Sequence, residues 1–122
     1  MTRPFIAALL LIASPLLAVP GVKSPVRLRM TNSSRWNGAC PHEFHFEGAI
    51  TSRRAGDVQY TWDRSDGASA PVETLHFTGP NQTQTVRTSW TIGKRYRGWE
   101  QIRVTAPNFI RSNKAGFTLN CR

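Results

Sequence analysis

Apolar residues alternate with polar ones in short stretches along most of the chain. In residues 26–31 every second side chain is apolar, and in residues 44–51 Phe44, Phe46 and Ile50 share one face. A period of two residues is that of a β-strand, because successive side chains of a strand point to opposite faces. No stretch holds the 3.6-residue period of an amphipathic helix, so the pattern predicts an all-β fold.

Five further stretches show the same alternation, and turn-forming residues separate them. They are residues 57–64, 74–78, 83–92, 99–105 and 115–121. The polar segments at residues 32–38 and 93–98 are expected to be loops. About seven short strands with regular turns predict an antiparallel β-sandwich, with a small barrel as the alternative.

The tryptophans differ in the side of the strand on which they are expected. Trp62 and Trp90 align with apolar neighbours two residues away, so both are predicted to lie in the core. Trp99 has the opposite parity to Ile102, which is expected to point inward. Trp99 is therefore expected on the outer face, unless a bulge near Gly98 turns it inward.

The N-terminal segment has the layout of a secretory signal peptide. Arg3 precedes an apolar run over residues 5–19, which is shorter than the roughly 20 residues of a membrane span. Residues 1–21 are expected to be removed by cleavage near residues 18–21, which leaves residues 22–122 as a single domain. A retained N-terminal anchor is the alternative. The protein is accordingly expected to be secreted or periplasmic, with no membrane span after cleavage.

The chain has two cysteines, Cys40 and Cys121. An even number of cysteines in an exported chain favours a disulfide, and two free thiols are the alternative. Because the two are far apart in the sequence, they do not form the Cys-Xaa-Xaa-Cys motif of redox enzymes.

Basic residues outnumber acidic ones by 16 to 7, which gives a net charge of +9. This balance favours an anionic partner, although it serves solubility equally well, and the expected partners are an anionic polysaccharide, a wall polymer or another envelope protein. Specific nucleic-acid binding is not expected. Four arginines are expected to point outward: Arg27, Arg29, Arg87 and Arg103. Whether they converge depends on the strand order.

The most suggestive stretch for ligand binding is GKRYRGW at residues 93–99. Cations that interleave with aromatic rings on a loop can hold phosphate and stack on a base or sugar. The candidate ligand-binding residues are Lys94, Arg95, Tyr96, Arg97, Trp99 and Arg103. The alternative is a solvated hairpin loop whose aromatic rings cap the end of the sandwich.

The segment CPHEFHF at residues 40–46 contains two histidines and a glutamate. Zinc proteases hold their metal with two histidines four positions apart on a helix. His42 and His45 are three positions apart in a predicted strand, so their side chains are expected on opposite faces, and no metal or other cofactor is expected there. His76 would meet His45 only if their strands were neighbours in one sheet.

Six segments occur in the same order in a group of small exported bacterial domains: CPHEFHFEGAI, VQYTWDRSDGA, TLHFTG, SWTIG, GWEQIRVTAPN and SNKAGFTLNC. Over residues 40–121 the chain resembles these immunoglobulin-like β-sandwiches. The resemblance implies the fold and the compartment, and it carries no assigned activity, substrate or catalytic residue. Trp62 matches the tryptophan that packs on the buried disulfide of true immunoglobulin domains. Cys40 and Cys121 depart from that pattern, because their bridge would tie the ends of the fold.

No catalytic constellation stands out in the sequence. No serine lies in a nucleophile-elbow pattern, no glycine-rich phosphate loop is present, and the acidic residues are expected at turns or outward positions. The sequence therefore predicts an exported, non-enzymatic immunoglobulin-like binding or adhesion module. Two alternatives stay open: a small secreted enzyme or metal-binding protein that uses His42, His45 and His76, and a small secreted inhibitor or accessory protein.

Overall fold

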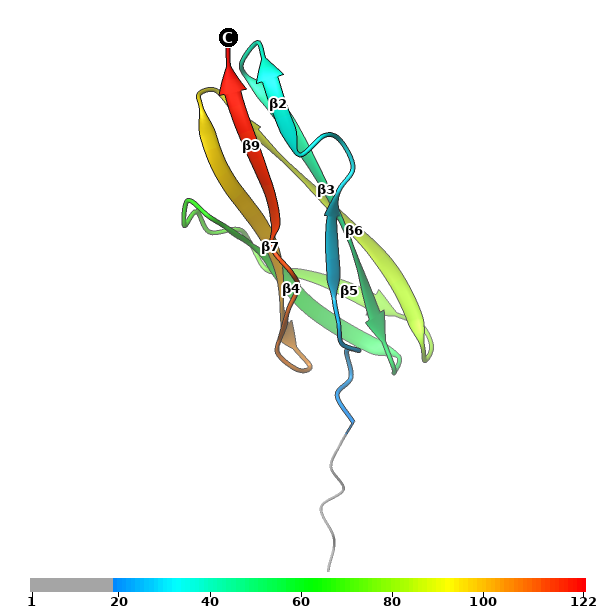
Figure 1. Ribbon diagram of the computed structural model, residues 1–122. Coiled ribbons are helices and arrows are strands. Elements are labelled where there is room, and N and C mark those ends of the chain that lie inside the picture. Colours follow the sequence, from blue (N-terminus) through cyan, green and yellow to red (C-terminus); the bar gives the residue numbers. More distant parts are fainter. Residues whose placement is uncertain (1–18) are drawn as a thin grey trace, which may run out of the picture.

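The computed structural model describes residues 19–122, which form two β-sheets and no helix (Figure 1). The predicted all-β, two-sheet architecture is confirmed. The expected signal peptide lies, up to residue 18, outside the described residues. In the described part of the chain, no helix is long and apolar enough to cross a membrane.

The smaller sheet has three antiparallel strands in the order β1-β3-β6. They are β1 (Arg27–Met30), β3 (His42–Ser52) and β6 (Gln82–Ile92). The two long strands β3 and β6 pair along their whole length, from His42 opposite Ile92 to Ser52 opposite Gln82. Every second residue of β3 from Phe44 onward is buried, so the strand turns one continuous side toward the other sheet.

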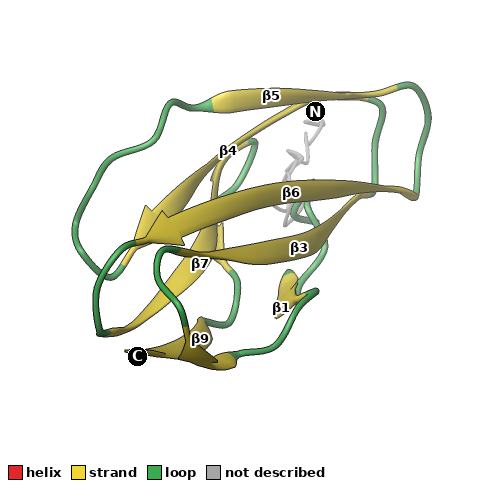
Figure 2. Cartoon of the chain, turned by 90° about the horizontal axis from the view of Figure 1, so that it is seen from above, coloured by secondary structure: helices red, strands yellow, loops and turns green. Residues whose placement is uncertain are grey.

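The larger sheet has the order β2-β9-β7-β4-β5, and a short strand β8 pairs with β7. In chain order its strands are β2 (Arg35–Gly38), β4 (Gly56–Arg64), β5 (Glu73–Phe77), β7 (Tyr96–Ala106), β8 (Ile110–Arg111) and β9 (Ala115–Cys121). β2 runs parallel to β9, and the other pairs are antiparallel. Figures 1 and 2 show the two sheets packed face to face in an elongated sandwich.

Aromatic rings dominate the core between the sheets. Phe44 of β3 and Phe117 of β9 stack across the sandwich with ring centroids 4.4 Å apart. Trp90 meets the same Phe117 ring edge-on at 5.3 Å, and Tyr96 lies 6.0 Å from it. Trp62 and Trp90 are both buried in this core, as predicted. The cluster fixes β6, β7 and β9 relative to one another at the end of the molecule where β7 begins.

Two segments that were expected to be loops contribute strands, and both predictions were wrong in this respect. β2 lies within residues 32–38, where no apolar alternation marks a strand, and its extended conformation depends on pairing with β9. β7 already begins at Tyr96, within the segment that was expected to be a loop. The Tyr96 ring points inward and packs against Trp90, with ring centroids 5.5 Å apart. The basic loop is therefore limited to residues 93–95.

Two asparagine side chains hold the N-terminal part of the domain. The N–H of Val22 donates to Asn108 Oδ1 at 2.8 Å, and Asn108 Nδ2 donates to the Val22 carbonyl at 3.3 Å. Asn113 makes the same pair of bonds with Leu28, each 2.8 Å long. Each amide thus supplies the donor and the acceptor that a neighbouring strand would otherwise supply.

Cys40 and Cys121 form a disulfide with a Cα–Cα distance of 5.5 Å, which confirms the prediction. The bond joins the connection between β2 and β3 to the last residue of β9. The bond therefore links the segment that leads into the smaller sheet to the last strand of the larger sheet, at the C-terminal end of the sandwich. A cross-link that closes a loop of this length contributes about 4 to 5 kcal/mol in the loop-entropy model.

Candidate functional site on the outer side of the larger sheet

The outward side of the larger sheet carries a group of side chains that we call the basic face. It consists of Arg35 of β2, Asp63 of β4, Arg97, Trp99, Gln101 and Arg103 of β7, Arg111 of β8, Lys114, and Gly116 and Thr118 of β9. In β7, Gly98, Glu100 and Ile102 are buried, so the residues between them point outward. Trp99 accordingly lies on the outer side, half-buried, as its parity predicts.

Arg35, Thr118 and Arg97 form a row across three neighbouring strands, because Thr118 is the register partner of both arginines. Arg95, in the loop before β7, lies beside this row. The three arginines line a groove of about 630 Å³, which we call the arginine groove. Among residues 19–122, no ion pair engages any of these three guanidinium groups. The groove is thus free to receive a negative charge.

A second groove, of about 570 Å³, surrounds Trp99 farther along β7, and we call it the tryptophan groove. Lys114 Nζ lies 4.3 Å from the centroid of the Trp99 ring, a cation–π contact. The register partner of Trp99 on β9 is Gly116, so no neighbouring side chain covers the ring from that strand. Arg111 lines the other part of the groove. The groove therefore combines an aromatic ring with cations.

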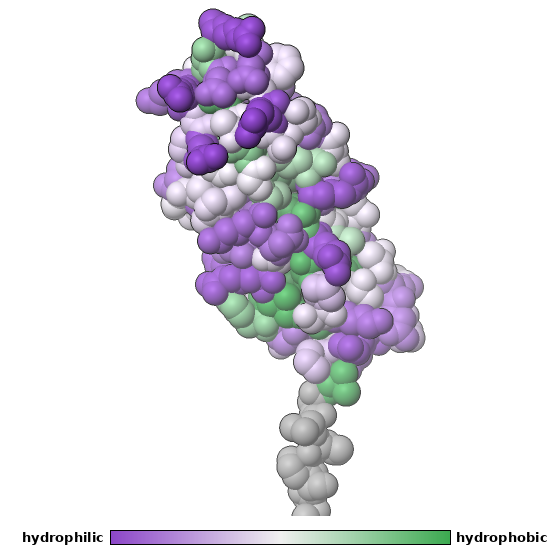
Figure 3. Space-filling model, viewed as in Figure 1, coloured by the Kyte–Doolittle hydropathy of each residue, from purple (hydrophilic) through white to green (hydrophobic). Residues whose placement is uncertain are grey.

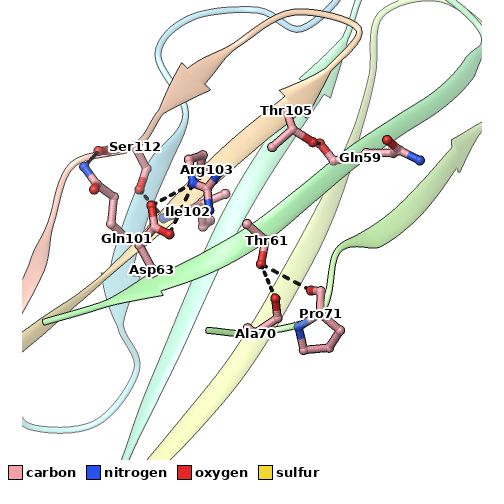
Figure 4. A network of polar contacts seen from close by, with 10 residues as sticks. All are labelled: Gln59, Thr61, Asp63, Ala70, Pro71, Gln101, Ile102, Arg103, Thr105 and Ser112. Atoms are coloured by element: carbon pink, nitrogen blue, oxygen red, sulfur yellow. Dashed lines mark hydrogen bonds and ion pairs between the residues drawn. The ribbon is translucent and has the colours of Figure 1, made fainter. Parts of the chain in front are cut away.

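A network of polar contacts holds the floor of the tryptophan groove in place (Figure 4). The guanidinium of Arg103 donates from Nε to both carboxylate oxygens of Asp63, at 3.2 and 3.0 Å. Gln101 donates to the carbonyl of Ser112 at 2.8 Å, which ties β7 to the segment before β9. Asp63 neutralises the charge of Arg103. Arg103 therefore supports the structure of the face and is not a free cation.

The structure divides the predicted ligand-binding residues into three groups. Lys94 and Arg95 lie in the loop, and Arg97 and Trp99 point outward from β7. The ring of Tyr96 packs against Trp90 and Phe117 of the core and its hydroxyl lies 2.8 Å from Ser65 Oγ, while the residue also lines the arginine groove. Arg103 lies on the same face as Trp99 but is paired with Asp63.

Sequence reasoning missed seven members of the basic face: Arg35, Asp63, Gln101, Arg111, Lys114, Gly116 and Thr118. Arg35 was assigned to a loop, and the strand β2 that carries it has no apolar alternation to reveal it. Arg111 and Lys114 flank the connection from β8 to β9. The outward parity of Thr118 within residues 115–121 was the one available signal.

The three histidines do not converge. His42 points inward at the start of β3 and stacks on Trp36 with ring centroids 4.3 Å apart. His45 faces outward on the other side of β3, 3.1 Å from Glu43. His76 lies on β5 of the other sheet, where its Nδ1 is 2.7 Å from Asp57. The alternative of one metal or catalytic site built from all three therefore has no geometric basis.

The outward arginines also fall on two separate faces. Arg29 of β1 and Arg87 of β6 flank Glu47 of β3 across the smaller sheet, with N–O distances of 2.6 and 3.0 Å. Arg103 belongs to the larger sheet. The stripe considered from the sequence is therefore not continuous, and on the smaller sheet Glu47 pairs with Arg29 and Arg87 while Arg27 has no ion pair among the described residues.

One acidic group lies beneath the basic face. Glu100 of β7 points inward, is 1% exposed, and its Oε1 has no hydrogen-bond partner among the described residues. Burial raises the pKa of Glu100 from 4.5 to about 7, while the positive charge of Arg64 acts in the opposite direction. At the neighbouring turn, the hydrogen bond from Arg64 lowers the pKa of Asp66.

No family model matches the sequence, and no curated protein matches it. Solved structures show similarity of fold. The immunoglobulin-like CARDB domain of a Pyrococcus furiosus protein, crystallised with di-metal ions, has a TM-score of 0.56 and 10% identity, with 80% of this chain and 94% of that domain covered. The solution structure of the same domain gives a TM-score of 0.53 and 12% identity, with 84% and 97% covered.

Two bacterial enzymes contain a similar fold as one part of a longer chain. An alkylpurine DNA glycosylase from Pseudomonas fluorescens, bound to DNA with an abasic site analog, has a TM-score of 0.50 and 18% identity over 83% of this chain. A β-glucosidase from Erythrobacter marinus has a TM-score of 0.55 and 9% identity over 81% of this chain. The matches span 31% of the glycosylase and 15% of the glucosidase. At such low identity these similarities concern the fold alone.

Proposed function

We propose that the protein is an exported, non-catalytic binding module that holds an acidic polymer on the basic face. The observation that carries this proposal is the group of cations without ion-pair partners around the half-buried ring of Trp99. A folded surface gains little from such clustering, because like charges repel one another. An anionic ligand would relieve that repulsion.

The charge balance of the basic face supports this assignment. Asp63 is the single carboxylate of the face as defined, and Arg103 already pairs with it at 3.0 Å. Arg35 and Arg97 point into solvent with their guanidinium groups free of ion pairs among the described residues. A guanidinium binds carboxylate, sulfate or phosphate oxygens through two parallel hydrogen bonds.

The loop near the C-terminal end of the molecule adds further positive charge beside the basic face. Figure 3 shows hydrophilic residues around the C-terminus as well as along the rest of this face. The loop at residues 93–95 contributes Lys94 and Arg95, both exposed. A long polyanion that follows β7 would therefore meet positive charge before and along the strand.

Export is part of the proposal because the partner is expected outside the cytoplasm. The disulfide supports it, since such bonds persist mainly in oxidising compartments. The apolar N-terminal run and the basic residue before it have the layout of an export signal. Wall polymers and acidic polysaccharides are the anionic polymers that a protein exported from a bacterium would encounter.

Binding to polyanions at two salt concentrations tests the proposal. We expect the purified domain to bind immobilised dextran sulfate or polygalacturonate, and the affinity to fall steeply between about 50 mM and about 200 mM salt as counterions compete. Replacing Lys94, Arg95 and Arg97 with serine should lower the affinity at low salt and flatten its salt dependence. Thermal stability should change little, because surface substitutions usually stay within about 0.5 kcal/mol each.

The matched control removes the same charge from the opposite end of the molecule. Lys23, Arg27 and Arg54 are exposed there, so their replacement by serine changes the net charge equally. This control should retain most of the affinity and the salt slope of the wild type. If the wild-type domain binds neither polymer at low salt, the proposed function is wrong.

A further inference from the structure

We propose that the two grooves are two subsites for one chain of an acidic polysaccharide. The arginine groove would bind an anionic substituent of the chain, and the tryptophan groove would bind the ring of a nearby sugar. This inference rests on the proposed function and deepens it, because it names the ligand class and its position on the face.

The arginine groove has the shape of a cradle for an oxyanion. Arg35 and Arg97 lie on either side of Thr118, one strand away in each direction. Neighbouring strands are about 4.8 Å apart, so the two arginine Cα atoms are separated by about 10 Å. Two long side chains can close over an anion from both sides at that separation, with the hydroxyl of Thr118 between them as a third donor.

The tryptophan groove follows directly along the same strand. Trp99 is two residues beyond Arg97 in β7, a distance of about 7 Å along the strand. The two subsites therefore lie in one line on one face, with no strand between them. A single polymer chain that runs along β7 would meet an anion site and then an aromatic platform.

The missing side chain at position 116 opens the approach to the Trp99 ring. Gly116 is opposite Trp99, and a Cβ atom added there would meet nothing closer than the carbonyl oxygen of Gly98, at 3.6 Å. The space could thus hold a side chain without strain, yet it is left open to solvent. Lys114, which lies over the ring, is a flexible exposed cation that can turn aside to pair with an acidic group of the bound sugar.

The arrangement of aromatic rings favours a polysaccharide over single-stranded nucleic acid. Proteins that bind single strands stack successive bases on a series of exposed aromatic rings. Here Trp99 is the one ring of the basic face as defined, because Tyr96 points into the core and Trp36 stacks on His42. Phe109 is exposed, but it lines neither of the two grooves.

The test compares variants of the two grooves on four probes: polygalacturonate, dextran sulfate, uncharged dextran and oligothymidylate. The double variant Arg35→Gln, Arg97→Gln should lose about tenfold or more in affinity for the acidic polysaccharides, because it removes two charge-assisted contacts. The control Lys23→Gln, Arg27→Gln makes the same charge change at the other end and should lose less than about threefold, since distant charges are screened. The ratio between carboxylated and sulfated probes then identifies which anion the groove prefers.

A second pair of variants tests the tryptophan groove separately. Gly116→Ile places a β-branched side chain against the Trp99 ring and should lower affinity for the acidic polysaccharides several-fold while the domain stays folded. Gly116→Ser, with its smaller side chain, should retain most of the affinity.

Several results would overturn the two-subsite arrangement. If the arginine variant and its control lose the same affinity for the acidic polysaccharides, the arginine groove is not the anion subsite, although polymer binding itself would stand. Equal affinities of the two Gly116 variants would remove the ring subsite. Uncharged dextran binding as tightly as the acidic polymers, or oligothymidylate binding more tightly than either, would contradict the ligand class. Failure of every acidic polymer to bind would instead contradict the proposed function.

Discussion

Glu100 is a carboxylic acid at a position that suits a neutral side chain. It is 1% exposed and one of its oxygens lacks a partner among the described residues, so the ionised form is poorly solvated. Its pKa is about 7 in the folded protein, against an ordinary value of 4.5. Between these two values the folded state holds a proton that the unfolded state has released. The contribution of Glu100 to the free energy of unfolding is therefore fully present below pH 4.5 and is lost as the pH rises through about 7.

We predict that Glu100→Gln removes this loss, because glutamine is isosteric with the protonated acid and carries no charge. Urea denaturation at a pH below the ordinary value and at a pH above 7 measures the effect. The wild type should lose about 1 to 3 kcal/mol between the two conditions from this group, and the variant should lose correspondingly less. The same pH dependence in both proteins would show that Glu100 is solvated and ionised throughout.

At the scale of single elements, the strands that were predicted from the sequence are those that bury an apolar side. Phe44, Phe46 and Ile50 revealed β3 because one side of that strand is fully buried. β2 has no such side, and it is a strand only through its pairing with β9, a contact that is remote in sequence. Local pattern could not show that pairing.

The candidate site was predictable in part for the same reason. The outward position of Trp99 followed from the buried parity of β7. Tyr96 was misplaced, because its inward contact with Phe117 depends on a strand that starts three residues earlier than the pattern indicated. The approach of Arg35 to Arg97 depends on the strand order β2-β9-β7, which alternation does not encode.

The asparagine side chains make a prediction for β1. Asn113 bonds both backbone groups of Leu28, so Asn113→Ala leaves one partly buried donor and one partly buried acceptor without their partner. We expect a loss of about 1 to 3 kcal/mol in unfolding free energy and faster hydrogen exchange at the Leu28 amide.

The alanine variant needs a control in which only part of the clamp is lost. Asn113→Asp keeps an acceptor for the Leu28 amide but loses the donor to its carbonyl, so it should be affected less in amide exchange. Unchanged exchange at Leu28 in the alanine variant would show that β1 is held by its pairing with β3 alone.

At the scale of the whole molecule, the two sheets differ in what they do with their outward charges. The smaller sheet places Glu47 between Arg29 and Arg87, which satisfies both. The larger sheet gathers Arg35, Arg97 and Lys114, none of which has an ion-pair partner among the described residues. The smaller sheet therefore has an acid that offsets part of its outward charge, whereas these three cations of the larger sheet are free to bind an anion.

The central claim is that an acidic polymer binds on the basic face, and mapping the contact surface tests it most directly. An acidic oligosaccharide such as oligogalacturonate is titrated into the isotope-labelled domain while backbone amide and indole resonances are followed. We predict concentration-dependent shifts that are confined to the basic face and the loop before β7, with the Trp99 indole, Arg97 and Thr118 among the largest. Shifts on the β1-β3-β6 sheet, or no shifts at low salt, would contradict the account.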